Sequence, residues 1–232
     1  MTTPPSELPT TIAYHILAEI RMRIITGDYP PGMQLREQEL EQQFGSSRGP
    51  IREALRLLLQ NGLVVHAPRR GFKVRDYTAK DLHDIYRLRA TMEELVLEEL
   101  RGQDLGRLVV DLRRSNKRMQ RHVERQNRNG FFEENAFFHG LVSEAVANEP
   151  LQRVMTYVNE ISLPVRYRLL ADSMPSGRSV AYHDTIIDAL AAGDIDQAKA
   201  VARQHIIENL DRAVAAFAGE APTAAAGLTS AQ

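Results

Sequence analysis

Hydrophobic residues recur every three or four positions along most of this chain. The first clear case is a set of isoleucines spaced by four, which predicts an amphipathic helix closed by Gly27: Ile12, Ile16, Ile20 and Ile24. The segment DYPPG then predicts a turn, because proline fixes the backbone and glycine relieves it. A short second helix is expected at roughly 36–44, with Leu40 and Phe44 buried and Gly45 at its end.

A third helix is expected directly after this break. Ser46 and Ser47 each offer a side-chain oxygen to cap it. Pro50 falls in the first turn, where its missing N–H costs nothing. The helix should run to about Asn61 and end at Gly62.

The hydrophobic period then changes from helical to alternating. The segment LVVHAPRRGFKV alternates on both sides of PRRG, which is typical of a β-hairpin with a basic tip. Up to about residue 76 the order is therefore helix, helix, turn, helix and β-wing. This order predicts a winged helix-turn-helix.

The rest of the chain returns to helical periodicity. Thr78, with Asp81 three residues on, is a good cap for the first of six helical stretches, near 79–101, 104–128, 130–147, 150–171, 178–192 and 195–217. We expect a mainly α protein with a winged helix-turn-helix at 11–76 and an all-helical bundle at 77–218. The Pro- and Thr-rich residues 1–10 and the small, polar tail 219–232 are expected to be disordered.

Composition narrows the class further. The chain has 232 residues, a net charge of −1 and no cysteine, so disulfides and thiolate metal sites are excluded. The N-terminus has no basic segment followed by an apolar one, and no uncharged apolar run approaches the roughly 20 residues of a membrane helix. We therefore expect a soluble, cytoplasmic protein.

Charge is unevenly distributed along this nearly neutral chain. Residues 46–75 hold one acid, Glu53, and seven bases, for a local charge of +6: Arg48, Arg52, Arg56, Arg69, Arg70, Lys73 and Arg75. A local basic patch indicates a polyanion bound at one place. The alternative is a solvated face on which the arginines pair with Glu53 and other acids.

The position of two of these arginines favours DNA. The N-terminal end of the second helix of a helix-turn-helix enters the major groove, and Arg48 and Arg52 lie there one turn apart. The arginine fork matches guanine O6 and N7. The hydroxyls of Ser46 and Ser47 suit phosphate oxygens, and the wing, with Arg69, Arg70 and Gly71, can reach the flanking minor groove or backbone.

The same segment resembles the DNA-binding domain of the GntR family of bacterial regulators. That family shows Leu-x-Glu-x-x-Leu, then Ser-Arg-x-Pro-x-Arg-Glu-Ala-Leu-x-x-Leu, then Gly-Leu before a wing ending in Gly, here Leu35, Glu37, Leu40, Ser47, Arg48, Pro50, Arg52, Glu53, Ala54, Leu55, Leu58, Gly62, Leu63 and Gly71. The resemblance implies a homodimer on a short palindromic double-stranded DNA operator. It implies that the following residues line that operator: Gln38, Ser47, Arg48, Gly49, Pro50, Arg52 and Arg70.

Three histidines of the second half fall where helices should face inward. His139 shares a helical face with Asn135, while His183 and His205 lie among apolar residues of two later helices. Inward imidazoles from three helices are one way in which bundles build metal sites. The alternative, that each is a hydrogen-bonded core histidine, stays open on the pattern alone.

Residues from about 78 to 218 resemble the helical FCD domain of the FadR-type GntR subfamily. The matches are Arg89-x-x-x-Glu93, Phe138-His139 and HDTIIDALAAGDIDQAKAVARQHI. The resemblance implies a divalent metal, zinc, nickel or similar, with the ligands Asn135, His139, His183 and His205. Aspartate is the commoner first ligand, and the neutral amide of Asn135 should bind metal more weakly.

The resemblance also implies a small carboxylate effector in the open coordination positions. Arg89 is the first candidate to neutralise it, ahead of Arg166, Tyr167 and Arg168. The leading hypothesis is thus a metabolite-responsive transcriptional regulator, a repressor and not an enzyme.

Two alternatives remain. One is a regulator that senses the metal itself or keeps it for structure. The other, a metal-dependent hydrolase, is disfavoured because no carboxylate shares the stripe of the three histidines and Asn135 cannot take a proton.

Overall fold

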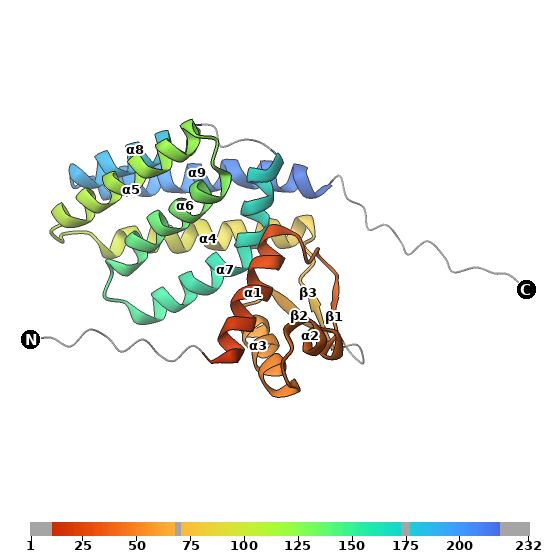
Figure 1. Ribbon diagram of the computed structural model, residues 1–232. Coiled ribbons are helices and arrows are strands. Elements are labelled where there is room, and N and C mark those ends of the chain that lie inside the picture. The colour runs from red at the N-terminus through yellow and green to blue at the C-terminus, as the bar shows by residue number, and fades with distance from the viewer. Residues whose placement is uncertain (1–10, 68–70, 173–176, 219–232) are drawn as a thin grey trace, which may run out of the picture.

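The computed structural model describes residues 11–67, 71–172 and 177–218, and these form nine helices and one small sheet (Figure 1). The N-terminal part consists of α1 (Ile12–Thr26), β1 (Gln34–Leu35), α2 (Glu37–Phe44), α3 (Arg48–Gln60), β2 (Val64–Ala67) and β3 (Gly71–Val74). The helical part consists of α4 (Ala79–Glu99), α5 (Gly106–Glu124), α6 (Arg128–Glu144), α7 (Glu149–Asp172), α8 (Arg178–Ala191) and α9 (Ile195–Ala218). The mainly α fold and the β-hairpin wing are confirmed.

The sheet has one strand more than the sequence predicts. Its order is β1-β3-β2, all antiparallel, with Gln34 opposite Lys73 and Val65 opposite the same Lys73 on the other side. A two-residue strand is too short to show alternation, so β1 is visible only through its pairing with β3. Its effect is to tie the loop before α2 to the wing.

Helix starts differ in how they are capped. Thr78 and Asp81 form the expected capping box at the start of α4, each side chain bonding the other's backbone N–H. Ser47 occupies the N-cap position of α3 but makes no side-chain cap bond, so that part of the capping prediction is wrong. The Ser46 hydroxyl points instead to the Ser47 carbonyl, 3.5 Å away.

The wing domain has its own apolar core. The inward faces of α1 and α3 pack against each other, with the residues Ile16, Ile20, Ile24, Ile51, Leu55 and Leu58 fully or almost fully buried. The spacing by three and four that predicted these helices is the spacing that buries one face of each. The opposite face of α3 is left to solvent.

In the helical part, α4 and α9 run side by side, and α5 packs against α6 and α8 (Figure 1). The bundle core includes Leu100, Leu112, Phe131, Phe138 and Ile187. No helix among the described residues is both long enough and apolar enough to span a bilayer.

The helix α7 lies between the bundle and the wing domain and contacts α1 (Figure 1). Ile25 of α1 is buried against Phe132 of α6 and Leu163 of α7. A Cβ added to Gly62, in the turn after α3, would stand 2.4 Å from Cγ2 of Ile161 on α7. The two parts of the chain are therefore packed in direct contact.

Candidate functional site

The exposed face of α3 carries the two arginines that the sequence places at its head. The side chains of Arg48 and Arg52 are 67% and 50% exposed, while Ile51 and Leu55 on the opposite face are fully buried. This division follows from the helical period, since residues 48 and 52 are four apart and share one face. Both guanidinium groups are thus presented to solvent from a helix that is anchored by its core side.

Both arginines share one carboxylate partner that sequence reasoning missed. Glu37 of α2 binds the Nε of Arg48 through Oε2 at 2.6 Å, and its Oε1 lies 3.2 Å from the Nε of Arg52. The hydrogen bond that Arg48 donates to Glu37 raises the pKa of Arg48. Glu37 thus contacts both arginines at Nε. The alternative considered from the sequence was pairing with Glu53 and other acids, and the acid that pairs with both arginines is Glu37.

The other residues predicted to line the operator fall near this face. Gln38, Arg48 and Gly71 line one hollow between α2, α3 and the wing, and Gly49, Pro50 and Arg52 line another along α3. Ser47 is exposed and Ser46 is half-buried. The predicted Arg70, with Arg69, lies outside the described residues.

The second site is a cluster of three buried histidines from three helices. His139 comes from α6, His183 from α8 and His205 from α9, and one ring nitrogen of each lies within 4.8 Å of the others. The His183 ring stacks on Phe138 with 4.0 Å between centroids, which fixes its plane. The sequence places these residues 44 and 22 positions apart, so only the packing of the bundle brings them together.

Several nitrogens in this cluster have no hydrogen-bond partner among the described residues. They are Nε2 of His139 and both ring nitrogens of His183. Buried polar atoms normally find partners, so these orphaned atoms argue against three ordinary core histidines. A divalent cation ligated by neutral imidazoles would satisfy them, and the residues present therefore fit such an ion.

The protonation state of the cluster also suits ligation. Burial lowers the pKa of His139 and holds that of His183 well below its usual value, and burial together with His139 lowers the pKa of His205 to about 3. All three imidazoles are consequently neutral at neutral pH, which leaves lone pairs free to bind a metal.

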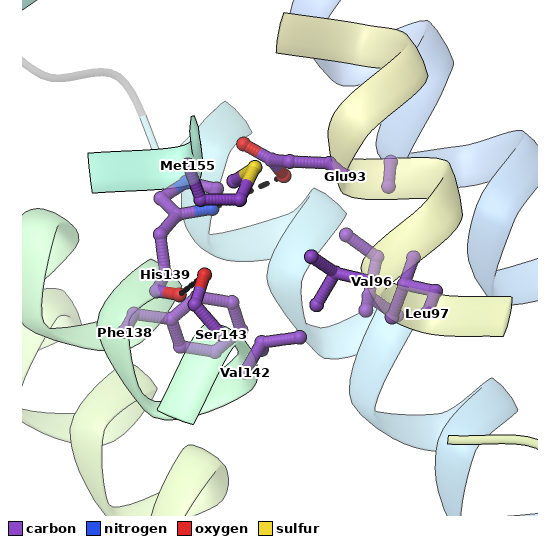
Figure 2. A pocket seen from close by; sticks show the side chains of 10 residues that line it. Glu93, Val96, Leu97, Phe138, His139, Val142, Ser143 and Met155 are labelled. Atoms are coloured by element: carbon purple, nitrogen blue, oxygen red, sulfur yellow. Dashed lines mark hydrogen bonds and ion pairs between the residues drawn. The ribbon is translucent and has the colours of Figure 1, made fainter. Parts of the chain in front are cut away.

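A carboxylate lies beside the cluster, on a helix that carries none of the histidines. Figure 2 shows Glu93 reaching from α4 toward His139, and the distance from Oε2 to Nδ1 is 3.3 Å. Its Oε1 accepts a 2.8 Å bond from Nη2 of Arg89. Burial opposes the ionisation of Glu93, yet His139 and Arg89 hold its pKa below the usual range.

Glu93 changes one sequence argument. The hydrolase alternative was disfavoured because no carboxylate shared the histidine stripe, but Glu93 stands next to His139 from another helix. The Arg89-x-x-x-Glu93 match was the available signal for it. Because Glu93 is engaged by both Arg89 and His139, it is placed to hold the imidazole rather than to take a proton from water.

The remaining predicted ligand, Asn135, lies one turn before His139 on α6 and is half-buried. The adjacent Glu134 points elsewhere, since it accepts two bonds of 2.8 Å from Arg118 of α5. Within the described residues the close group consists of the three histidines, and the role of Asn135 stays a prediction.

A cavity of about 440 Å³ opens beside the cluster, with His139 in its wall. Arg89, the predicted effector contact, is not among the lining residues and is already paired with Glu93. Arg166 does line the cavity, and its Nη2 has no hydrogen-bond partner among the described residues.

The fold and the exposed arginine face define a DNA-binding regulator of the winged helix-turn-helix class. Residues 12–74 match the bacterial regulatory proteins of the gntR family, and residues 84–208, more than half of the chain, match the FCD domain. The chain belongs to the GntR family of transcriptional regulators with an FCD domain, and it is not an enzyme.

Curated relatives agree with this membership. The chain is 32% identical over 157 residues to the uncharacterized HTH-type transcriptional regulator YdhC of Bacillus subtilis, covering 66% of this chain and 69% of that protein. It is 29% identical over 197 residues to the "Probable D-xylose utilization operon transcriptional repressor" of Paenarthrobacter nicotinovorans, covering 85% and 86% of the two chains.

A solved structure has the same fold. A crystal structure described as a transcriptional regulator GntR, from Rhodococcus sp. RHA1, superposes with a TM-score of 0.72. The match covers 88% of this chain and 98% of that chain at 22% identity. At this identity the likeness concerns the fold alone.

Proposed function

We propose that this protein is a FadR-type repressor that binds a palindromic operator as a homodimer and responds to a small carboxylate held at a divalent metal site. The observation that carries the proposal is the group of three buried histidines beside a cavity. The DNA-binding role acts on the chromosome, which fits a cytoplasmic location. The relative named as a repressor supports the sign of the regulation.

DNA recognition is assigned to the head of α3 and its surroundings. Arg48 and Arg52 would contact base edges, and each such contact contributes roughly 1–3 kcal/mol of discrimination. Backbone N–H groups at the start of α3 would contact phosphate oxygens. The contact set is Gln38, Ser46, Ser47, Gly49, Pro50, Arg70 and Gly71. A dimer is required because a symmetric operator needs two copies of the recognition helix.

The proposed metal ligands are His139, His183 and His205, with the amide oxygen of Asn135 as the fourth. A zinc, nickel or similar ion bound there would leave coordination positions for a carboxylate. Glu93 would accept the Nδ1–H of His139 and so leave Nε2 for the ion. Arg89 would act through Glu93, and its direct contact with an effector stays a prediction.

Regulation would follow from the contact between the two parts of the chain. An effector that favours one placement of the wing domain shifts the spacing of the two recognition helices in the dimer, and the half-sites no longer match. The second candidate is a regulator that senses the metal itself, favoured by the orphaned histidine nitrogens.

The test is a thermal-shift screen of metal-loaded and chelated protein against small carboxylates, combined with operator binding. Stabilisation by an acid only when metal is present supports the proposal, and a ligand at about 100 times its dissociation constant adds roughly 2.7 kcal/mol. DNA binding that responds to zinc or nickel without any acid would favour direct metal sensing. No response to either would leave a DNA-binding protein whose histidines serve structure.

A further inference from the structure

The wing domain contacts the helical bundle at residues 157–163 of α7 (Figure 1). Two separate parts of the wing domain reach this stretch, namely α1 and the segment that leads into α4. Just beyond it, Val165 and Leu169 are buried in one apolar cluster with residues of α4 and α9. The wing domain therefore contacts a helix that is itself fixed in the bundle.

The first contact area lies where the chain passes from the wing domain into α4. The hydroxyl of Tyr77 donates a buried 2.7 Å hydrogen bond to the carbonyl of Ile161. The Ile161 side chain lies so close to Gly62 that a Cβ on Gly62 would stand 2.4 Å from it. Nε of Arg75 donates to the carbonyl of the same Gly62. Because these contacts surround the covalent connection between the domains, a rotation of the wing domain would turn about this point.

The second contact area is made by α1. Arg21 donates two bonds to the carboxylate of Glu160, from Nε to Oε2 at 2.8 Å and from Nη2 to Oε1 at 2.6 Å. The two side chains are 31% and 17% exposed, so the pair is partly shielded from water. One turn further along α1, Ile25 is buried against Phe132 and Leu163. One ionic contact and one apolar contact thus hold α1 against the bundle.

These α1 contacts control the orientation of the recognition helix. Ile20 of α1 is buried in the same core as Ile51 and Leu55 of α3, and because such interiors are close-packed, α1 and α3 should move as one body. The apolar contact of Ile25 is non-directional and tolerates sliding. The paired bonds of Arg21 favour a single orientation, because a guanidinium and a carboxylate match in one plane.

A symmetric operator constrains the angle between two wing domains as well as their separation. Each base pair added between the half-sites moves them apart by about 3.4 Å and turns one relative to the other by about 35°. A wing domain fixed to the bundle at both contact areas cannot follow such a turn. A wing domain held only at its connection to α4 could follow it, and would then accept several spacings.

We propose that the ion pair between Arg21 and Glu160 determines which half-site spacing this protein accepts, by fixing the orientation of the wing domain on the bundle. The two residues are positioning residues, since they act on DNA through the placement of α3. The inference rests on the proposed function, a homodimer on a palindromic operator, and deepens it by naming the residues that set its spacing specificity.

The test compares operators of equal total length whose half-sites are separated by the selected spacer, by one base pair fewer, or by one base pair more. The operator is first selected from random duplexes with the wild-type protein. Fluorescence anisotropy gives the Kd for each duplex, and the spacing ratio is the Kd on a changed spacer divided by the Kd on the selected one. For the wild type we expect a ratio of roughly ten or more, because the base contacts of one half-site are misplaced.

Arg21→Glu and Glu160→Arg each place like charges opposite one another, which repel across the domain contact. Each should lower the spacing ratio to about three or less. The reciprocal double variant, Arg21→Glu with Glu160→Arg, restores an ion pair of reversed direction and should regain most of the wild-type ratio. A residue that serves stability alone would not give this pattern of loss and rescue.

Arg153→Glu and Glu149→Arg are the matched controls, because they reverse the same charges in an exposed pair that lies within α7 itself. Both should keep the wild-type ratio. A uniform loss of DNA affinity through the altered net charge cancels in the ratio. Binding to a duplex with one half-site shows that the recognition face is intact. If thermal melting shows that a reversal variant is unfolded, Arg21→Gln and Glu160→Gln replace it and should also lower the ratio.

Each outcome supports or overturns a defined statement. Reversal variants that keep the wild-type ratio would overturn the inference. A lowered ratio that the double variant does not regain would overturn it as well, because the ion pair is then not the cause. A wild-type protein without any spacing preference would overturn the proposed dimeric operator, and the spacing role with it, so the two failures are seen separately.

Discussion

Glu93 of α4 faces the Nδ1 of His139 across 3.3 Å, so one imidazole of the histidine cluster is held by a carboxylate from another helix. This contact assigns the proton to Nδ1 and leaves Nε2, which has no partner among the described residues, for the cluster. A carboxylate that orients a ligating histidine commonly raises metal affinity by roughly 10- to 100-fold.

We therefore expect Glu93→Gln to weaken zinc binding by about 10- to 100-fold while keeping one zinc per chain at saturation. The measurement is zinc competition against a chromophoric chelator. Glu94→Gln is the control, because Glu94 is the next residue of α4 and pairs with Arg203 away from the cluster. Unchanged affinity in Glu93→Gln would mean that the contact with His139 does not position a ligand.

Arg52→Ala should weaken binding to an operator selected with the wild-type protein by roughly tenfold or more, since one arginine–guanine contact is worth about 1–3 kcal/mol. Thermal melting should stay nearly unchanged, because the side chain is half exposed and its pair with Glu37 is a surface contact. Fluorescence anisotropy at fixed salt measures the affinity, with Arg153→Ala of α7 as the exposed control. Equal affinities would remove Arg52 from the recognition surface.

The positions of most helices could be predicted from local sequence pattern. Each helix buries one face, and residues close in sequence mark where it begins and ends. The α3 face illustrates this, since the spacing of Arg48, Ile51, Arg52 and Leu55 alone separates solvent from core. The three histidines were found for the same reason, as polar residues on apolar faces. What local pattern cannot show is which residue of another helix lies opposite.

Glu37 and Glu93 are two functional residues whose contacts could not be predicted from local sequence pattern. Each acts on residues of a different helix, at a distance set by helix crossing rather than by spacing along the chain. The cavity is a third case, because it exists only where α1 docks on α6 and α7. The two-residue strand β1 was missed since it is too short to carry a period.

Removing one histidine tests the proposed ligand set. His183→Ala should lower the zinc or nickel content measured by elemental analysis and abolish stabilisation by added metal, because His183 is fully buried at the centre of the cluster. Basal operator binding should persist, since the recognition face belongs to the other domain. Metal content equal to that of the wild type would show that these histidines are not the ligands.

Lowering the pH should reduce the free energy of unfolding of the metal-free protein at pH values above those at which its carboxylates titrate. The histidine pKa values are lowered in the folded state, to about 3 for His205, whereas an unfolded histidine titrates near 6.5. Below pH 6.5 these histidines are therefore protonated in the unfolded chain but stay neutral in the folded cluster. Each such histidine lowers the free energy of unfolding by about 1.4 kcal/mol per pH unit.

The measurement is urea unfolding in chelator between pH 7 and pH 5, above the usual range of glutamate and aspartate. His205→Gln should show a shallower decline than the wild type, because one titrating group is gone. The stabilising contribution is present above pH 6.5 and lost as the pH falls toward 3. A free energy of unfolding that stays level over this interval would contradict the lowered pKa values.

The packing contact between the wing domain and α7 can be tested by substituting a single glycine. Gly62 has a φ of +75°, and a Cβ there would stand 2.4 Å from Cγ2 of Ile161 and 3.1 Å from the ring of Tyr157. Gly62→Ala should therefore combine the backbone cost of about 1–2 kcal/mol with a clash against α7. Gly193 has a φ of +73° and no atom within 4 Å of such a Cβ, so Gly193→Ala carries the backbone cost alone. We expect Gly62→Ala to melt at a lower temperature than Gly193→Ala and to make the turn after α3 more accessible to protease. Equal melting and equal cleavage in the two variants would mean that the wing domain does not rest on α7 at this point.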